Sequence, residues 1–249
     1  MGHLNKLHEE YASKGLVIMA SSPEPESAIQ QFVDEFEAKY PVMIEESDTY
    51  AEYGFGALPR AVLIGPAGRV LFKEHPNRLT VNHIDNHLES MKLLPEFPKP
   101  LRAVGKAIDS GDYGKAHKKA TAALKKDDLK ETAQQAIEWI DWLGTTWMEA
   151  AKGAAEAGSV HAAYTCYECI EDAYKGLPLA AEAKKAAAGL KADKANKLEI
   201  TAGEKLAALK KKLAKLSPSK AEKAIDAFLK KYGDTKAGPK AKALRPKRP

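Results

Sequence analysis

The 249-residue sequence predicts an α/β domain followed by an all-helical domain. Up to residue 94, amphipathic helical segments alternate with short apolar runs typical of strands. From Leu101 onward the strand patterns disappear, and Ala, Lys, Leu and Glu dominate. Prolines at 95, 98 and 100 separate the two regions. We therefore expect four parts: an α/β domain at 1–94, a proline-rich linker at 95–100, a helical domain at 101–235 and a basic tail at 236–249.

The first domain begins with a helix, because Leu4, Leu7 and Tyr11 recur at helical spacing before Gly15 ends the pattern. The continuous apolar run at 16–20 predicts a strand that is covered on both faces. The remaining predicted elements are a helix at 26–39, a strand at 42–44, a hairpin of strands 61–64 and 70–72 around the glycine-containing turn 65–69, and a helix at 81–93. This order indicates a small mixed sheet with helices on both faces.

The second domain contains only helical patterns. Glycines and a Ser-Pro pair divide it into predicted helices at about 101–109, 112–126, 128–156, 159–175, 178–214 and 219–232. We expect the longest helix to break near Gly189 or at 201–203, where small residues weaken the helical pattern.

An internal similarity runs through the helical domain. A shift of 58 residues aligns small and aromatic positions, namely Ala163 with Ala221, Cys166 with Ala224, Tyr167 with Ile225, Ile170 with Phe228 and Tyr174 with Tyr232. A shift of 47 residues places Gly111 on Gly158 and Ala116 on Ala163. Such helix pairs resemble degenerate tetratricopeptide-like repeats over part of residues 110–245, and stacked helical hairpins offer concave surfaces to protein partners.

Charge is distributed unevenly along the chain. Residues 1–100 hold 9 Lys and Arg against 15 Asp and Glu, giving −6, whereas residues 201–249 hold 15 against 4, giving +11. The basic end, from Lys205 to Arg248, could attract nucleic acid, an acidic protein face or an anionic membrane surface. A solvated helix with a frayed end is favoured, because no aromatic residue is interleaved with arginine and no nucleic-acid motif is present, so nucleic acid is not an expected partner. No apolar run reaches the roughly 18 residues that cross a bilayer, so no membrane span is expected.

Two segments carry a resemblance to a known family. The segment 57–70, ALPRAVLIGPAGRV, resembles the second half of a thioredoxin-like domain of the TlpA/redoxin kind, and so does the helix at 3–11 with the following residues 14–18. The resemblance covers residues 1 to about 93. It implies that Pro59 is a cis proline that opens the strand beside the redox centre, and that Leu58 and Pro59 shape the substrate groove. A trans proline at the first position of a strand is the alternative.

The sequence departs from this family at its start, where the family has a central strand and a Cys-x-x-Cys motif before the first helix. The expected fold is therefore a thioredoxin-like α/β domain lacking its first strand and its redox motif, followed by a helical-hairpin repeat domain. No catalytic residue is expected in this chain, and the cysteine pair is expected upstream of Met1. The favoured interpretation is that the sequence starts downstream of the true start; the other is that the domain is a non-catalytic relic.

The resemblance implies a relative of thiol–disulfide oxidoreductases that is catalytically incompetent as given. A full-length form would act on a protein disulfide or thiol substrate without a cofactor. An extracytoplasmic, periplasmic location is expected if both the resemblance and the truncation hold. The alternative is a non-catalytic interaction scaffold that uses the helical repeats and the basic tail, with a protein partner at the repeats.

Cys166 and Cys169 form a Cys-x-x-Cys in the helical domain, but a structural role is favoured. A redox motif places its first cysteine at a helix N-terminus, where the thiol pKa is lowered, whereas these cysteines lie inside a predicted helix. They are the chain's only two cysteines, and His161 alone does not complete a zinc site, so no metal site is predicted here.

Two further groups of residues are also predicted to be structural. His83 and His87 lie four residues apart on one predicted helix, with His75 nearby, and we favour a solvated polar face over a metal site. Three tryptophans share one predicted helix and are more typical of a core between helices than of a ligand platform: Trp139, Trp142 and Trp147.

Overall fold

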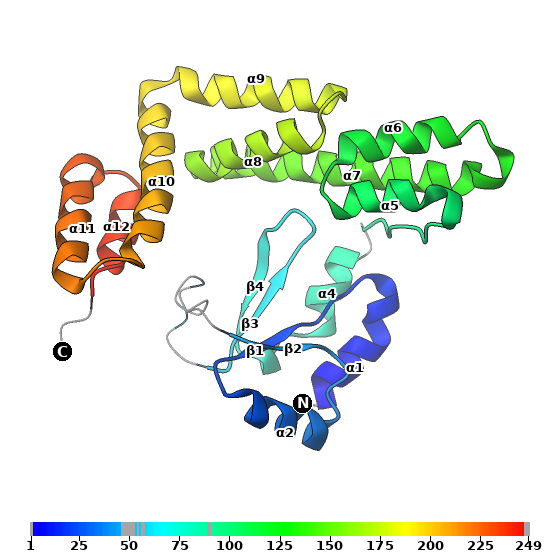
Figure 1. Cartoon of the computed structure of the whole chain (residues 1–249), viewed down its shortest axis with the longest axis horizontal. Helices are drawn as coiled ribbons and strands as arrows, with labels where there is room; N and C mark the ends of the chain where they lie inside the picture. Colours follow the sequence, from blue (N-terminus) through cyan, green and yellow to red (C-terminus); the bar gives the residue numbers. More distant parts are fainter. Residues whose placement is uncertain (1, 46–52, 54, 56–57, 89–90, 247–249) are drawn as a thin grey trace. The chain divides into compact units, whose positions relative to one another are not determined.

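The computed structural model describes residues 2–45, 53, 55, 58–88 and 91–246 (Figure 1). The chain forms two compact units, Met1–Leu94 and Pro95–Pro249. The N-terminal unit is α/β and the C-terminal unit is all-helical, and each is described by itself.

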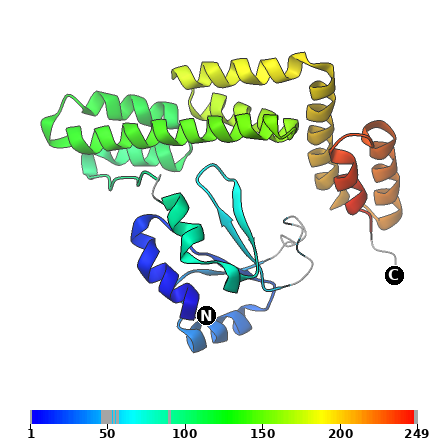
Figure 2. The same cartoon turned by 180° about the vertical axis from the view of Figure 1, so that it is seen from behind.

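The N-terminal unit has the order of elements that the sequence predicts. Its main elements are α1 (Gly2–Tyr11), β1 (Ala20–Ser22), α2 (Glu26–Phe36), β2 (Val42–Ile44), β3 (Ala61–Ile64), β4 (Val70–Glu74) and α4 (Val81–Leu88). The short 3₁₀ helices η1 (Ala12–Lys14) and η2 (Pro76–Arg78) precede β1 and α4. In Figures 1 and 2, α2 and α4 lie on opposite sides of β1 and β2.

The strands form two ladders of two strands each. β1 pairs with β2 in parallel, with Ala20 opposite Val42, and β3 pairs with β4 in an antiparallel hairpin, with Ala61 opposite Glu74. The predicted hairpin is confirmed, and the positive φ of Gly68, 70°, allows its tight turn. In the part of the chain that the structure describes, the two ladders are not hydrogen-bonded to each other. The expectation of one mixed sheet is therefore not met among these residues.

The strand expected at 16–20 starts later, at Ala20. There the N–H of Ala20 donates to the carbonyl of Pro41 at 2.9 Å, where the paired segment around β2 begins. The expectation that both faces of this run are covered is wrong, because Val17 is 73% exposed and Met19 is 62% exposed. The neighbouring side chains at 16 and 18 are half-buried. Side chains of an extended segment point alternately to opposite sides, and here both sides carry apolar residues. The sequence therefore does not reveal which side is exposed.

The core of the N-terminal unit lies between α1 and α4. Leu7, Tyr11 and Ile84 are buried together, and half-buried leucines surround them. The helix predicted at 81–93 ends at Leu88; residues 89 and 90 lie outside the described residues, and residues 91–93 are not helical.

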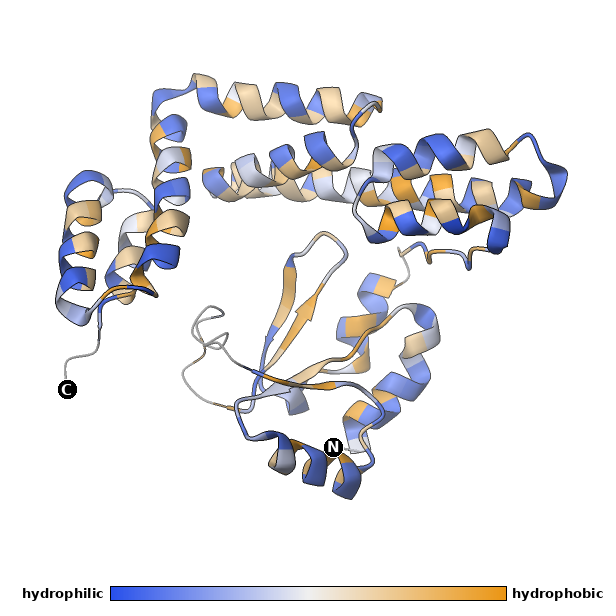
Figure 3. Cartoon of the chain, in the orientation of Figure 1, coloured by the Kyte–Doolittle hydropathy of each residue, from blue (hydrophilic) through white to orange (hydrophobic). Residues whose placement is uncertain are grey.

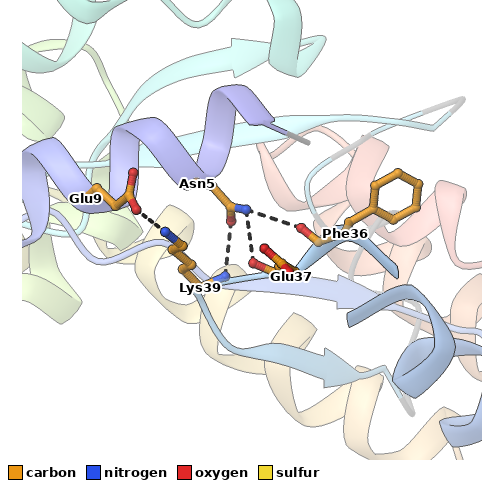
Figure 4. A network of polar contacts seen from close by, with 5 residues as sticks. All are labelled: Asn5, Glu9, Phe36, Glu37 and Lys39. Atoms are coloured by element: carbon orange, nitrogen blue, oxygen red, sulfur yellow. Dashed lines mark hydrogen bonds and ion pairs between the residues drawn. The ribbon is translucent and has the colours of Figure 1, made fainter. Parts of the chain in front are cut away.

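A polar network joins the start of α1 to the end of α2 (Figure 4). The side-chain amide of Asn5 donates to the carbonyls of Phe36 and Glu37 at 3.3 and 3.0 Å, and its oxygen accepts the Lys39 N–H at 3.1 Å. Lys39 also forms an ion pair with Glu9. Because Glu37 adopts φ 45°, α2 ends at Phe36 instead of the predicted residue 39.

The C-terminal unit is a succession of helices that pack on their sequence neighbours. They are η3 (Lys99–Leu101), α5 (Arg102–Asp109), α6 (Tyr113–Ala123), α7 (Asp127–Glu156), α8 (Val160–Ala173), α9 (Pro178–Ala192), α10 (Lys194–Leu213), α11 (Pro218–Tyr232) and α12 (Ala237–Ala243). Figure 3 shows polar and apolar colours alternating along α10 and α11, as expected for helices that bury one side.

The break of the long predicted helix 178–214 occurs at Asp193, so both predicted positions are wrong. The Asp193 side chain accepts the N–H of Asn196 at 2.8 Å and caps the start of α10. Gly189 lies inside α9. Gly203 lies inside α10, where the ring of His161 packs so closely that a Cβ would meet it at 2.1 Å.

Positions related by the internal similarity have equivalent environments. In the 58-residue alignment of α8 with α11, four of the five pairs are buried in both helices, and the pair Cys166 and Ala224 is half-buried in both. In the 47-residue alignment, Gly111 and Gly158 both have positive φ, 74° and 70°. The residue after each glycine donates its N–H five residues back, at 2.9 and 2.7 Å. The same glycine-terminated turn thus precedes α6 and α8.

The helical unit contains two buried clusters that meet along α10. The larger cluster spans α5 to the start of α10 and includes Ile200, while the smaller one joins α10, α11 and α12 and includes Leu206. The segment 236–249, considered a basic tail from its sequence, contributes Ala237 and Ala241 to this smaller core.

Candidate functional site

The unpaired edges of β1 and β3 are the most unusual feature of the N-terminal unit. Within the described residues, the backbone groups of Val17, Ile18 and Met19 make no hydrogen bond, and β3 has β4 as its one ladder partner. A row of unpaired N–H and C=O groups is a template for another strand. The exposed side chains of Val17 and Met19 add apolar surface along the β1 segment. The arrangement can therefore accept an extended segment of polypeptide.

Leu58 and Pro59, the predicted groove residues, directly precede β3. The peptide bond between them is cis, as the resemblance implies for Pro59. Leu58 is 54% exposed and Pro59 is also exposed. Both residues are thus accessible beside the start of β3.

A second unsatisfied group lies on α1. The Nδ1 atom of His8 is buried and has no hydrogen-bond partner among the described residues. His8 follows Leu4 and precedes Tyr11 at helical spacing, on the side of α1 that carries its core residues. Buried polar atoms in folded proteins normally have a partner, so this nitrogen marks an incomplete environment.

The two cysteines of the chain lie elsewhere, inside a helix of the C-terminal unit. Residues 1–94 contain no cysteine, and Cys166 and Cys169 lie inside α8 as free thiols. The Cys166 thiol is half-buried and donates to the carbonyl of Trp147 at 3.7 Å. Burial, with a smaller effect of Cys169, raises the pKa of Cys166, and a raised pKa disfavours the reactive thiolate.

The histidines considered as metal ligands take part in helix-end contacts. The Nδ1 atom of His83 accepts the Thr80 N–H at 3.2 Å, and that of His75 accepts the Asn77 N–H at 3.2 Å. No group of three metal-binding side chains occurs among the residues that the structure describes. Likewise, no helix within the described ranges has the length and apolar character needed to cross a membrane.

Trp139 and Trp147 pack on the core of the helical unit, whereas Trp142 is half-buried and is not among the residues that pack on it. Trp139 and Trp147 of α7 make edge-on contacts with Tyr113 of α6, with ring centroids 6.1 and 5.7 Å apart. The ring of Tyr174, at the end of α8, packs in a tilted arrangement on the same tyrosine, with centroids 5.2 Å apart. Burial raises the pKa of Tyr113, as expected for a phenol enclosed by aromatic rings.

The structure therefore defines an α/β unit with open strand edges and a cis proline before its hairpin, joined to a helical unit. The chain is similar to the thiol-disulfide oxidoreductase ResA of Halalkalibacterium halodurans, with 32% identity over 94 residues, which are 37% of this chain and 53% of that protein. It is 35% identical over 75 residues to a ResA of Bacillus cereus, covering 29% of this chain and 43% of that protein.

The chain thus spans about half the length, or less, of the curated relatives it matches. No family model and no solved structure matches it. This partial homology supports a thioredoxin-like domain in the chain and a relationship to the redoxin family of thiol–disulfide oxidoreductases. The role of Leu58 and Pro59 as groove residues stays a prediction. The sequence analysis missed the exposure of Val17 and Met19, for which a continuous apolar run offers no signal.

Proposed function

We propose that the N-terminal unit is part of a redoxin-type thiol–disulfide oxidoreductase domain whose sheet is completed by one further strand between β1 and β3. That strand would be followed by the redox cysteines at the start of the helix that continues as α1. The chain by itself does not catalyse thiol exchange, because residues 1–94 hold no cysteine. The observation that carries the proposal is the pair of open edges at β1 and β3, taken together with the similarity to ResA.

The need of backbone groups for hydrogen-bond partners supports a strand between β1 and β3. Backbone groups that are removed from water need hydrogen-bond partners, and one strand between β1 and β3 would pair both rows of groups at once. It would also cover Val17 and Met19, whose exposure leaves apolar surface in contact with water.

Leu58 and Pro59 would form one wall of the substrate groove in this proposal. They precede β3, which would be the neighbour of the added strand, and the cysteines would follow the end of that strand. The exposed Leu58 side chain offers an apolar contact to an unfolded or extended substrate segment. A protein disulfide or thiol is the proposed substrate.

The test compares the chain as given with a chimera in which the strand and Cys-x-x-Cys segment of a ResA protein precede Met1. We expect the chimera to reduce insulin with dithiothreitol as electron donor, and we expect the chain as given to remain inactive. Substitution of the first added cysteine by serine serves as the control, because it keeps the strand and removes the attacking thiolate. Activity of the chain as given that disappears in C166S/C169S would refute the proposal.

Amide hydrogen exchange tests the strand itself. We expect the amides of Val17 and Met19 to exchange at least about tenfold more slowly in the chimera, because hydrogen-bonded sheet amides are protected. Unchanged exchange in a folded chimera would show that the added strand does not lie beside β1.

A second function, a scaffold for protein partners, is favoured by the equivalence of α8 and α11. We propose that the helical unit is a tetratricopeptide-like repeat domain, supported by the shared burial pattern and by the glycine turns at Gly111 and Gly158. Stacked hairpins of this kind present extended surfaces to partners. A pull-down with residues 95–249 beside the full chain tests it; a partner that needs only residues 1–94 would argue against the scaffold role.

A further inference from the structure

A cavity of about 320 Å³ lies in the helical unit where α8, α10 and α12 meet. It is located at the junction of the two buried clusters of that unit. Its lining comes from three separate segments, which lie at 159–162, between 199 and 210, and between 236 and 240. In Figure 1, α8 begins beside α10, close to the place where α12 packs on α10.

The charged groups of the lining are mostly positive. Lys210, Lys236 and Lys240 bring three positive charges and Glu199 one negative charge, so the lining carries +2 with His161 neutral. Both carboxylate oxygens of Glu199 accept the backbone N–H of Lys236, at 3.2 and 3.1 Å. The acidic group is thus engaged with the backbone at the start of α12.

Lys236 is held beside the start of α8. Its ammonium group donates to the carbonyl of Ala157 at 3.4 Å. The helix start itself contributes donors, because Ser159 provides no side-chain cap and the N–H groups of residues 160–162 have no hydrogen-bond partner among the described residues. Free N–H groups at a helix start favour anions. These N–H groups add to the attraction of the lysines for an anion, and the helix start alone would not form a binding site.

Part of the cavity wall is apolar. Val160, Leu206 and Ala237 are buried residues of the lining. The ring of His161 lies against Gly203, where even a Cβ would overlap it. A ligand in this cavity would therefore meet both cationic groups and hydrocarbon.

We propose that this cavity binds a small organic anion that carries a phosphate group. A dianionic phosphate matches the net positive lining and accepts hydrogen bonds from ammonium and backbone N–H groups. An attached organic group would contact the apolar wall. A cavity of this size suits a small metabolite, since ligand pockets start at about 300 Å³. The field of residues 201–249, with 15 basic and 4 acidic side chains, also attracts anions. The proposal concerns the helical unit and does not depend on redox function.

The test is a titration of the full chain with phenyl phosphate, followed by amide shifts in NMR spectra and by calorimetry. We expect saturable shifts at residues 160–162. Lys236→Gln should weaken binding about tenfold or more, because it removes a charge-assisted hydrogen bond. Glu199→Gln should tighten binding, because it removes the opposing charge and keeps an acceptor for the Lys236 N–H. Inorganic phosphate should bind more weakly than phenyl phosphate.

Lys242→Gln is the matched control, because this lysine lies on α12 and is exposed but does not line the cavity. It lowers the net charge by the same amount as Lys236→Gln, so we expect a change of no more than about twofold. Lys240→Gln is a second lining variant, used if circular dichroism shows that Lys236→Gln is unfolded. Equal weakening by a lining variant and the control, or shifts that never saturate, would overturn the proposal in favour of unspecific attraction to a basic surface.

Discussion

The close approach of α7 to its neighbours at Gly144 leads to a quantitative prediction for Gly144→Ala. A Cβ at this position would lie 2.4 Å from Cδ2 of Leu179 and 2.8 Å from Cε1 of Tyr174. The tyrosine cannot move away freely, because its buried hydroxyl donates to the carbonyl of Ile140 at 3.0 Å. Gly189 in α9 is the matched control, since its Cβ would meet no heavy atom within 4 Å.

The two substitutions should change stability in opposite directions. Alanine is favoured over glycine in a helix by about 1 kcal/mol. Gly189→Ala should therefore stabilise the helical unit by about 0.5–1 kcal/mol. At Gly144 the same gain is offset by an overpacking cost of about 1–3 kcal/mol, so a net destabilisation of up to about 2 kcal/mol is expected. For a urea m-value of about 2 kcal/mol/M, the midpoint should fall by up to about 1 M.

Urea unfolding followed by tryptophan fluorescence measures this effect. All three tryptophans of the chain lie in α7, so the signal reports the helical unit. Combining Gly144→Ala with Leu179→Ala should recover part of the loss, and the double-mutant cycle should give a coupling of about 1 kcal/mol. If Gly144→Ala raises the midpoint as Gly189→Ala does, the close packing of α7 against Leu179 and Tyr174 is refuted.

Three further predictions follow from individual contacts. The hydrogen bond from Lys39 lowers the pKa of Glu9, so an NMR titration should place the Glu9 midpoint below 4.5, and Lys39→Gln should raise it. Since the folded pKa is depressed, this pair stabilises the fold above about pH 4.5 and loses its effect as the pH falls through that midpoint; an unchanged midpoint in the variant would contradict the pairing. Asp193→Ala should destabilise the helical unit by about 1 kcal/mol in urea unfolding, because it removes the cap of α10, and no change would argue against the cap. Iodoacetamide should modify the exposed Cys169 before Cys166, whose pKa is raised by burial; mass spectrometry of partly labelled protein checks the order, and faster labelling of Cys166 would contradict its burial.

The candidate site could be predicted from the sequence only in part. The segment around Leu58 and Pro59 is recognisable because its residues are contiguous and carry a family pattern. The exposure of Val17 and Met19 could not be predicted, because every residue of the run is apolar and burial depends on which segments cover it. The break at Asp193 was not predicted, because the sequence analysis expected the helix to break at a glycine. Gly203 instead lies inside α10, where its small size lets His161 pack against it.

The amino-acid sequence by itself determined the order of helices and strands in the N-terminal unit and the hairpin turn at Gly68, because these depend on residues close together in the chain. Only the tertiary structure decided which strand edges are paired and which groups surround the cavity. Segments around residues 160, 200 and 236 meet there although they are far apart in sequence. Such contacts result from packing between whole helices, and no local pattern of residues encodes them.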